Sequence, residues 1–196
     1  MLDNVHNVEP YGSDNDIFIK ALNANGSSSG TRIIGSSGYD YGTGIAFAQD
    51  GSYIIAGYTD GNLDGQATDN LYSTDAFIIK YNTDHTKAWT RLIESQQNGL
   101  TAAYCTTIGS DSSIYVAGEK SDGLSTESFV AKYSPTGDQE WLRTFGTPQN
   151  DRANGIAVGK DGNIYVTGYQ NSNLYTATTP NNPDTVSYTH LTLPTI

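Results

Sequence analysis

Short apolar runs alternate with polar turns along most of the chain, and this pattern is typical of β-structure. Three of the runs, 53–57, 114–118 and 164–168, are rich in Tyr, Ile and Val, and each ends in a small residue followed by Gly. No segment shows the 3.6-residue apolar period over a helical length, and Gly or Pro interrupts nearly every window. We therefore expect strands throughout the repeating part of the chain.

The runs recur with a long period, so the chain repeats one unit. An acid, a variable residue and a Phe recur at spacings of 59 and 52 residues, and an Arg follows at one fixed distance. The markers are Phe18, Phe77 and Phe129, followed by Arg32, Arg91 and Arg143. Periods of about 50 residues are typical of propellers, solenoids and arrays.

Each unit contains two predicted hairpins. Runs on either side of Asp50-Gly51, Asp111-Ser112 and Asp161-Gly162 form the first hairpin, because Asp and Gly tolerate the backbone angles of tight turns. The second hairpin pairs 77–81 with 89–93, and 129–133 with 141–145. Two consecutive hairpins predict a four-stranded antiparallel meander.

A four-stranded unit of this length predicts an all-β fold, a fragment of a β-propeller. Small residues at alternate positions of each first strand fit the innermost strand, and the Trp-containing strands would be outermost. The predicted division is a segment of uncertain structure at 1–13, a half-blade at 16–35, blades at 40–95 and 101–147, and a half-blade at 151–185. A linear β-solenoid is the alternative, but the Asp-Gly turns favour antiparallel hairpins.

The last residues are expected to be foreign to the protein. Residues 186–195 match the translation of a sequencing adapter, so we treat 186–196 as a non-native tail. The alternative is a genuine polar strand. Asp184-Thr185 stands where the other units have an acid and one residue before Phe, so we expect the natural chain to continue with further blades. The total number of blades stays open.

The same motifs resemble the bacterial β-propeller repeat family called SBBP. The resemblance rests on 75–81, 89–91, 151–158, 161–169 and 61–66, and it covers about residues 14–185. It implies a propeller in a large exported or surface-attached bacterial protein, with an extracellular or cell-surface location and no single catalytic role. The first unit departs from the pattern, since Gly30 occupies the Trp position and Lys20 falls one place early.

Charge and composition narrow the possible partners. The net charge is -11, with 21 acidic against 10 basic residues, so nucleic acid is not an expected partner. No stretch approaches the about 18 apolar residues of a membrane helix. Cys105 is the single cysteine, which excludes an internal disulfide, and we interpret it as a small buried strand residue.

One loop has the ligand pattern of a calcium site. Asp60, Asn62 and Asp64 stand at alternate positions before Gly65, as in the first half of an EF-hand loop. The twelfth position is Leu71, where an EF-hand needs a bidentate Glu, and Asp69 could substitute only along another loop path. The alternative is a turn of short polar residues without metal. Calcium is the one cofactor that the sequence suggests.

Other repeated residues are better explained by packing. Arg32, Arg91 and Arg143 lie on three separate units, so we expect ion pairs or packing of the side-chain stems along the rim and not one ligand clamp. Trp89 and Trp141 are expected to pack between blades and not to form a sugar platform. No catalytic residue can be named.

Two functions remain open from the sequence. The first is a non-catalytic propeller module for binding or scaffolding, with a protein or glycan ligand and with the remaining blades of the same chain as neighbours. The alternative is a fragment of a propeller enzyme acting on glycans, with its catalytic residues in other blades. Membrane insertion is not expected.

Overall fold

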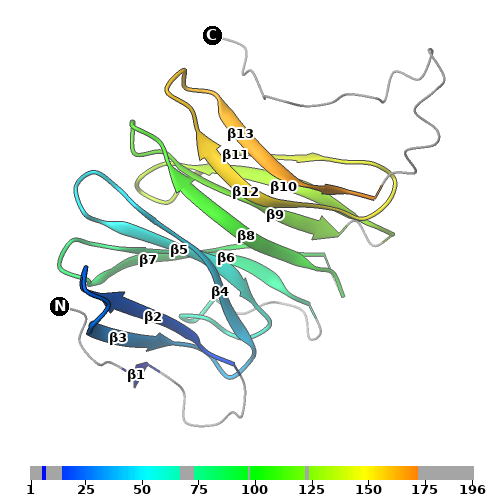
Figure 1. Cartoon of the computed structure of the whole chain (residues 1–196). Coiled ribbons are helices and arrows are strands. Elements are labelled where there is room, and N and C mark those ends of the chain that lie inside the picture. The colour runs from blue at the N-terminus through cyan, green and yellow to red at the C-terminus, as the bar shows by residue number, and fades with distance from the viewer. Residues whose placement is uncertain (1–5, 8–14, 67–72, 97, 122–123, 172–196) are drawn as a thin grey trace.

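The computed structural model describes residues 6–7, 15–66, 73–96, 98–121 and 124–171. Every regular element among these residues is a β-strand, and there are 13 of them. The strands form four successive sheets that fan out one behind another (Figure 1). Within the described residues, the structure contains no helix with the length and apolar character that a membrane crossing requires.

Two of the sheets are complete four-stranded meanders. The first consists of β4 (Asp40–Phe47), β5 (Tyr53–Thr59), β6 (Asp75–Tyr81) and β7 (Lys87–Ile93). The second consists of β8 (Thr101–Ile108), β9 (Ile114–Ser121), β10 (Thr126–Tyr133) and β11 (Gln139–Phe145). All neighbouring strands in both sheets are antiparallel, which confirms the all-β fold and its propeller-type blades.

The two ends of the described chain are two-stranded parts of the same unit. β2 (Ile17–Leu22) pairs with β3 (Ser28–Ile34), and β1 (His6–Asn7) adds a short parallel strand on the far side of β3. At the other end β12 (Asp151–Val158) pairs with β13 (Ile164–Gln170). The predicted adapter-derived tail at 186–196 lies outside the described residues.

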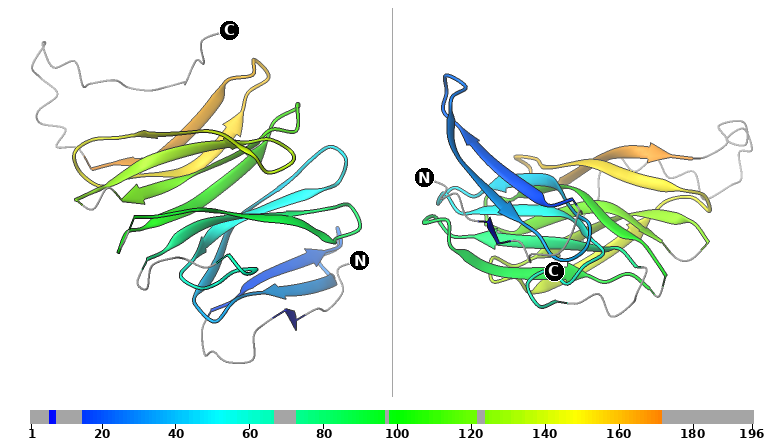
Figure 2. Two further views of the ribbon diagram at one scale, coloured as in Figure 1. Left: turned by 180° about the vertical axis from the view of Figure 1, so that it is seen from behind. Right: turned by 90° about the horizontal axis from the view of Figure 1, so that it is seen from below.

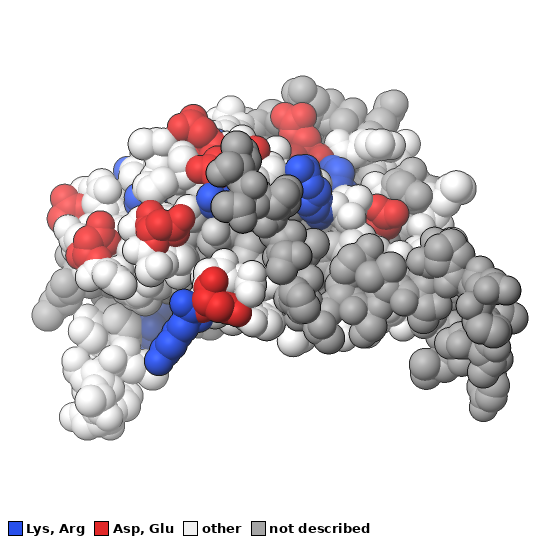
Figure 3. All heavy atoms as spheres, turned by 90° about the horizontal axis from the view of Figure 1, so that it is seen from above, with Lys and Arg blue, Asp and Glu red and all other residues white. Residues whose placement is uncertain are grey.

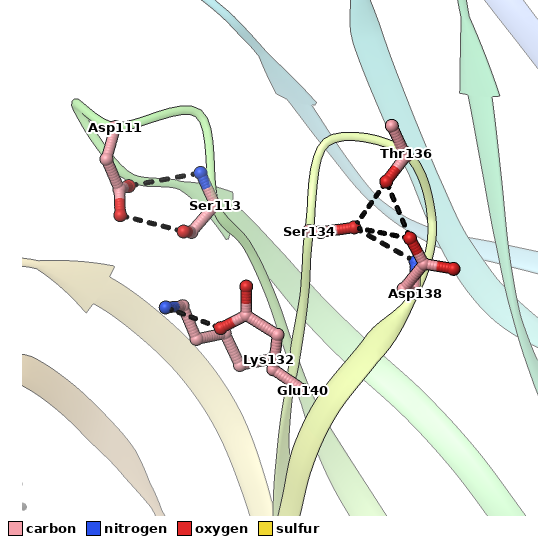
Figure 4. A network of polar contacts seen from close by, with 7 residues as sticks. All are labelled: Asp111, Ser113, Lys132, Ser134, Thr136, Asp138 and Glu140. Atoms are coloured by element: carbon pink, nitrogen blue, oxygen red, sulfur yellow. Dashed lines mark hydrogen bonds and ion pairs between the residues drawn. The ribbon is translucent and has the colours of Figure 1, made fainter.

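Aspartates close the hairpin turns through hydrogen bonds to their own loops. Asp111 accepts hydrogen bonds from the backbone N–H and the hydroxyl of Ser113, at 3.0 and 2.8 Å. At the same end of this blade, Asp138 accepts from the hydroxyl of Thr136 at 2.7 Å (Figure 4). Such side-chain contacts replace backbone partners that a turn leaves unused, which is why the chain is rich in Asp.

Apolar side chains fill the spaces between successive sheets. One cluster joins the first blade to the second, and includes Ile54, Ile78, Phe129 and Tyr133, with Trp89 packed against it. A second cluster joins the β2–β3 sheet to the first blade, and a third joins the second blade to β12–β13. Because both faces of the central blades are covered, Phe77 and Phe129 have no exposed surface.

Each innermost strand contains a β-bulge at the same place. The register shifts between Gly42 and Gly44 in β4, between Ala103 and Cys105 in β8, and between Ala153 and Gly155 in β12. The extra residues are Thr43, Tyr104 and Asn154.

The bulges explain the Gly that ends each second-strand motif. A Cβ on Gly118 would lie 1.9 Å from the carbonyl oxygen of Ala102, and Gly57 and Gly168 meet the equivalent carbonyls at the same distance. The inner strands also lie close together, since a Cβ on Gly44 would be 3.3 Å from the Cα of Cys105. The hydroxyl of Thr43 donates to the carbonyl of Ala103 at 2.7 Å and ties β4 to β8.

The repeated arginines connect the outer part of one sheet to a turn of the next. Arg32 Nη1 donates to the carbonyl of His85 at 2.6 Å, and Arg91 Nε donates to the carbonyl of Gly137 at 2.8 Å. His85 and Gly137 hold the same turn position and both have positive φ, at 65° and 89°. Arg32 and Arg91 therefore make hydrogen bonds to backbone carbonyls of the next blade in place of the expected ion pairs, whereas Arg143 donates to the carbonyl of its own neighbour Leu142.

Candidate ligand-binding site

A row of aromatic and charged side chains crosses three sheets at the bulge end of the inner strands. The rings of Tyr41 and Tyr58 stack with centroids 4.9 Å apart, and Tyr104 meets Tyr58 edge-on at 6.0 Å. The guanidinium of Arg152 lies 4.3 Å from the centre of the Tyr104 ring and 5.4 Å from that of Tyr169. We call these five residues the tyrosine row.

The bulge positions the middle of this row. Tyr104 is the extra residue of β8, so its side chain departs from the alternation of the strand. From there it reaches Tyr58 of the preceding blade and Arg152 of the following half-blade. A feature of backbone geometry thus brings residues from three repeats to one place.

Hydrogen bonds hold two of the tyrosine hydroxyls, those of Tyr41 and Tyr104. Tyr104 donates to Glu119 Oε1 at 2.6 Å, and the Asn15 side-chain amide donates to the Tyr41 hydroxyl at 2.6 Å. Burial raises the pKa of Tyr58, and burial followed by the Glu119 hydrogen bond raises the pKa of Tyr104. Both phenols therefore stay neutral hydrogen-bonding groups across the physiological pH range.

A small open cavity lies beside the stacked pair. Its volume is about 270 Å³, and it is lined by Tyr39, Tyr41, Tyr58, Asp60 and Thr74. Asp60 accepts the backbone N–H of Tyr39 at 2.6 Å, which joins the loop before β4 to the loop after β5. The cavity is open to solvent and combines exposed aromatic surface with a carboxylate and a hydroxyl.

The predicted calcium residues occupy one loop but make separate contacts. Asp60 faces Tyr39, whereas Asp64 forms an ion pair with Lys87 and accepts a hydrogen bond from Thr90 on β7. Asn62 is exposed. Among the described residues there is no group of three or more His, Cys, Asp or Glu side chains placed to hold a metal ion. Asp69 and Leu71 lie outside the described residues, so calcium at Asp60, Asn62 and Asp64 stays a prediction.

Cys105 is a half-buried strand residue next to the tyrosine row. Its thiol contacts the carbonyl of Ala117 at 3.7 Å, and burial raises its pKa to about 11. A thiol with a raised pKa is protonated at neutral pH and a poor nucleophile. This agrees with the structural interpretation of the residue.

The sequence did not predict the tyrosine row, because the row consists of residues that do not recur from unit to unit. Tyr41 corresponds to Ala102 and Arg152 in the other units, and Tyr104 corresponds to Thr43 and Asn154. The residue type at these positions differs from unit to unit, whereas the strand that contains them occurs in all three units. Large side chains at non-repeating positions of the inner strands were the signal that could have revealed the site.

Charged side chains are scattered over the surface. Acidic residues outnumber basic ones, and on the face shown in Figure 3 the two kinds lie interspersed. This view shows no broad basic area of the sort that binds a phosphate backbone.

Comparison with known proteins identifies the type of repeat in this chain. A family model named SBBP, a beta-propeller repeat, matches residues 140–176, which confirms the resemblance to this repeat. The regulatory protein FlaEY of Caulobacter vibrioides is 29% identical over 175 residues, which cover 81% of this chain and 17% of FlaEY. The chain thus spans less than a fifth of that relative's length.

A solved structure is also similar. It is the crystal structure of a protein of unknown function from Bacteroides caccae, with a TM-score of 0.47 and 13% identity. The match covers 80% of this chain and 48% of that protein.

Proposed function

We propose that the chain is a non-catalytic binding module of an exported or surface bacterial protein, and that it binds a neutral oligosaccharide at the tyrosine row. The observation that carries the proposal is the stacked Tyr41–Tyr58 pair at the edge of the 270 Å³ cavity. The SBBP repeat at residues 140–176 supports the propeller framework, and such repeats are typical of exported or surface proteins.

The chemistry of the row favours a sugar. Tyr41 is 37% exposed and Tyr39 is 48% exposed, so flat aromatic surface is available to the apolar face of a pyranose ring. The neutral phenol hydroxyls, Asp60 and Thr74 can hydrogen-bond sugar hydroxyls around that ring. A cavity of this volume lies just below the usual range for small ligands, so it would hold one sugar unit of a longer chain.

The charges around the row favour a neutral ligand over a charged one. Glu119 and Asp60 are acidic, while Arg152 is basic and already lies over two tyrosine rings. An anionic ligand would meet the two carboxylates, and a cationic ligand would meet the guanidinium. Specificity would then come from hydrogen bonds and ring stacking.

Binding to an array of immobilised oligosaccharides tests the proposal. The wild-type chain should bind a subset of neutral glycans, and Tyr41→Ala and Tyr58→Ala should each weaken that binding about tenfold, since loss of one aromatic contact costs about 1 kcal/mol or more. Tyr165→Ala is the matched control, because Tyr165 is 41% exposed at the opposite end of β13 from Tyr169. Equal losses in all three variants would refute the site.

The same incubations separate binding from catalysis. Recovery of the intact glycan after prolonged incubation supports the binding role. Cleavage of the glycan by the purified chain would contradict it and would favour the alternative, a propeller enzyme acting on glycans.

A further inference from the structure

Two loops meet at the rim of the cavity beside the stacked tyrosines. Residues 35–39 connect β3 of the N-terminal sheet to β4 of the first blade, and these two sheets lie next to each other (Figure 2). Residues 60–66 follow β5. Each loop contributes one residue to the cavity, Tyr39 and Asp60 respectively. The contact between the loops therefore determines where these two residues stand.

Gly38 and Gly61 bring the two backbones into direct contact. A Cβ on Gly38 would lie 2.8 Å from both the N and the Cα of Gly61, and a Cβ on Gly61 would lie 2.8 Å from the N of Gly38. Neither glycine has a positive φ, so the backbone conformation does not require glycine here. The requirement is space, because a larger residue at either position would push the loops apart.

The same contact holds the Asp60 carboxylate. Asp60 Oδ1 accepts the backbone N–H of Tyr39 at 2.6 Å, and the backbone N–H of Asp60 donates to the carbonyl of Tyr39 at 3.2 Å. A Cβ on Gly38 would lie only 2.4 Å from Asp60 Oδ1, so the carboxylate has room because residue 38 is Gly. One oxygen of Asp60 is thus fixed by a charge-assisted hydrogen bond.

The other units repeat the backbone part of this contact. The N–H of Ser121 donates to the carbonyl of Leu100 at 2.7 Å, and the N–H of Asn171 donates to the carbonyl of Asn150 at 3.2 Å. Ser121 and Asn171 hold the position of Asp60 relative to the inner strands. The contact belongs to the repeated framework, and the first unit places an acidic side chain on it.

Loop 60–66 is also anchored on the side away from the cavity. Leu63 has no exposed surface and belongs to the apolar cluster between the β2–β3 sheet and the first blade. Asp64 forms an ion pair with Lys87 and accepts a hydrogen bond from Thr90, both on β7. The start of the loop is therefore ordered before a ligand binds, which reduces the entropy that binding would cost.

We propose that Gly38 and Gly61 are positioning residues that hold Asp60 as a fixed hydrogen-bond acceptor, and that Asp60 selects sugars with a free hydroxyl over O-acetylated ones. This rests on the proposed function, since it assigns specificity within the same site. Asp60 is exposed, and its second oxygen, Oδ2, has no hydrogen bond to the described residues. A carboxylate oxygen accepts hydrogen bonds and donates none.

The difference between a hydroxyl and an acetyl ester explains the selection. A free sugar hydroxyl can donate to Asp60 Oδ2, whereas acetylation removes the O–H and leaves only acceptor oxygens. The ester carbonyl would face a carboxylate that cannot turn away, because Tyr39 holds Oδ1. Placing an unfavourable contact against the wrong ligand is a common source of specificity. We expect a preference of at least about tenfold, the value of one hydrogen bond to a charged group.

The position of Asp60 can be tested without any ligand. In the proton NMR spectrum of the full chain, the backbone amide of Tyr39 should resonate downfield, because it donates to a carboxylate. Asp60→Ala should move this signal upfield. Gly38→Ala and Gly61→Ala should cause the same shift although Asp60 is still present.

Gly109→Ala is the matched control for the two glycine variants. A Cβ on Gly109 would lie 2.6 Å from Asp111 Oδ1, so it also crowds a carboxylate, but in a hairpin turn of the second blade. Gly109 has no positive φ either. This variant should lose stability and leave both the Tyr39 amide signal and the glycan preference unchanged.

Binding to the array of neutral oligosaccharides, before and after chemical O-acetylation, tests the selection. The wild-type chain should bind the unmodified glycans at least about tenfold more tightly. Asp60→Asn keeps one oxygen for the Tyr39 N–H and replaces the other by an amide donor, so this preference should disappear. Asn171 occupies the equivalent position in the C-terminal unit, so Asn is compatible with the framework.

Three results would overturn parts of the account separately. A Tyr39 amide signal that Gly38→Ala leaves in place would contradict the positioning role. An equal preference for unmodified glycans in the wild type and in Asp60→Asn would contradict selection by Asp60. Absence of binding to every glycan would refute the proposed function and with it the selection, whereas the Tyr39 signal would still decide whether the glycines position Asp60.

Discussion

Replacing Gly118 by Ala should destabilise the protein far more than a Gly-to-Ala change usually does. Gly118 lies in the interior of β9, the second strand of the second blade, opposite the bulge of β8. A Cβ at this position would lie 1.9 Å from the carbonyl oxygen of Ala102 and 2.9 Å from the Cα of Ala103. Comfortable carbon-to-oxygen contacts need about 3.3 Å, so β8 would have to move by roughly 1.4 Å.

The magnitude follows from what that movement breaks. Overpacking costs about 1 to 3 kcal/mol, and the loss of one or two ladder hydrogen bonds costs about 1 kcal/mol each. Ala regains about 0.5 to 1 kcal/mol by restricting the unfolded chain. The net loss in the free energy of unfolding is therefore about 3 kcal/mol, which would lower the melting temperature by about 6 to 12 °C.

Gly162→Ala is the matched control. Gly162 lies in a hairpin turn with a φ of 80°, and its Cβ would meet nothing within 4 Å. Only the left-handed conformation is penalised there, at about 1 to 2 kcal/mol. Urea unfolding followed by circular dichroism would measure both variants. A Gly118→Ala loss no larger than that of Gly162→Ala would refute the account of the bulge.

Three further predictions concern the inter-blade contacts, the turns and the candidate metal loop. Arg91→Ala should lower the free energy of unfolding by about 1 to 2 kcal/mol, because the hydrogen bond to Gly137 and the contact with the Trp89 ring are lost. Arg91→Lys should not restore that free energy. Denaturant titration would measure both variants. The hydrogen bond from Ser52 lowers the pKa of Asp50, and the one from the Tyr165 hydroxyl lowers the pKa of Asp161. Their contribution to the free energy of unfolding should be complete above the ordinary pKa of 3.8 and lost as the pH falls through the lowered values. Melting temperatures that rise on acidification from pH 5 to pH 2 would contradict this. If the loop binds calcium, millimolar calcium should raise the melting temperature and Asp64→Ala should abolish the rise, whereas identical melting with calcium and with chelator would leave the loop a turn.

The strands and turns were predictable because local chemistry specifies them. Asp50-Gly51 requires a tight turn wherever it occurs, and the repeated Phe and Arg positions fix the spacing of the second hairpin. The turn residues and the repeated spacing can both be read from residues close together in the sequence, so neither requires knowledge of the fold.

The binding site was not predictable by the same reasoning. The tyrosine row depends on a bulge that no residue type marks by itself, since Thr43, Tyr104 and Asn154 share no chemistry. It also depends on contacts between residues of different sheets, such as Tyr104 with Tyr58 and Arg152. The sequence shows that Gly57, Gly118 and Gly168 recur. The reason for Gly is seen only in the structure, where a Cβ would collide with a carbonyl oxygen of the paired strand.

A crystal structure of the chain with a neutral oligosaccharide that it binds would test the central claim most directly. The account predicts one sugar ring against the exposed surface of Tyr41 or Tyr39, with its hydroxyls within hydrogen-bonding distance of Asp60 or Thr74. A sugar bound elsewhere, for example against Trp89 or Trp141 on the outer strands, would contradict it.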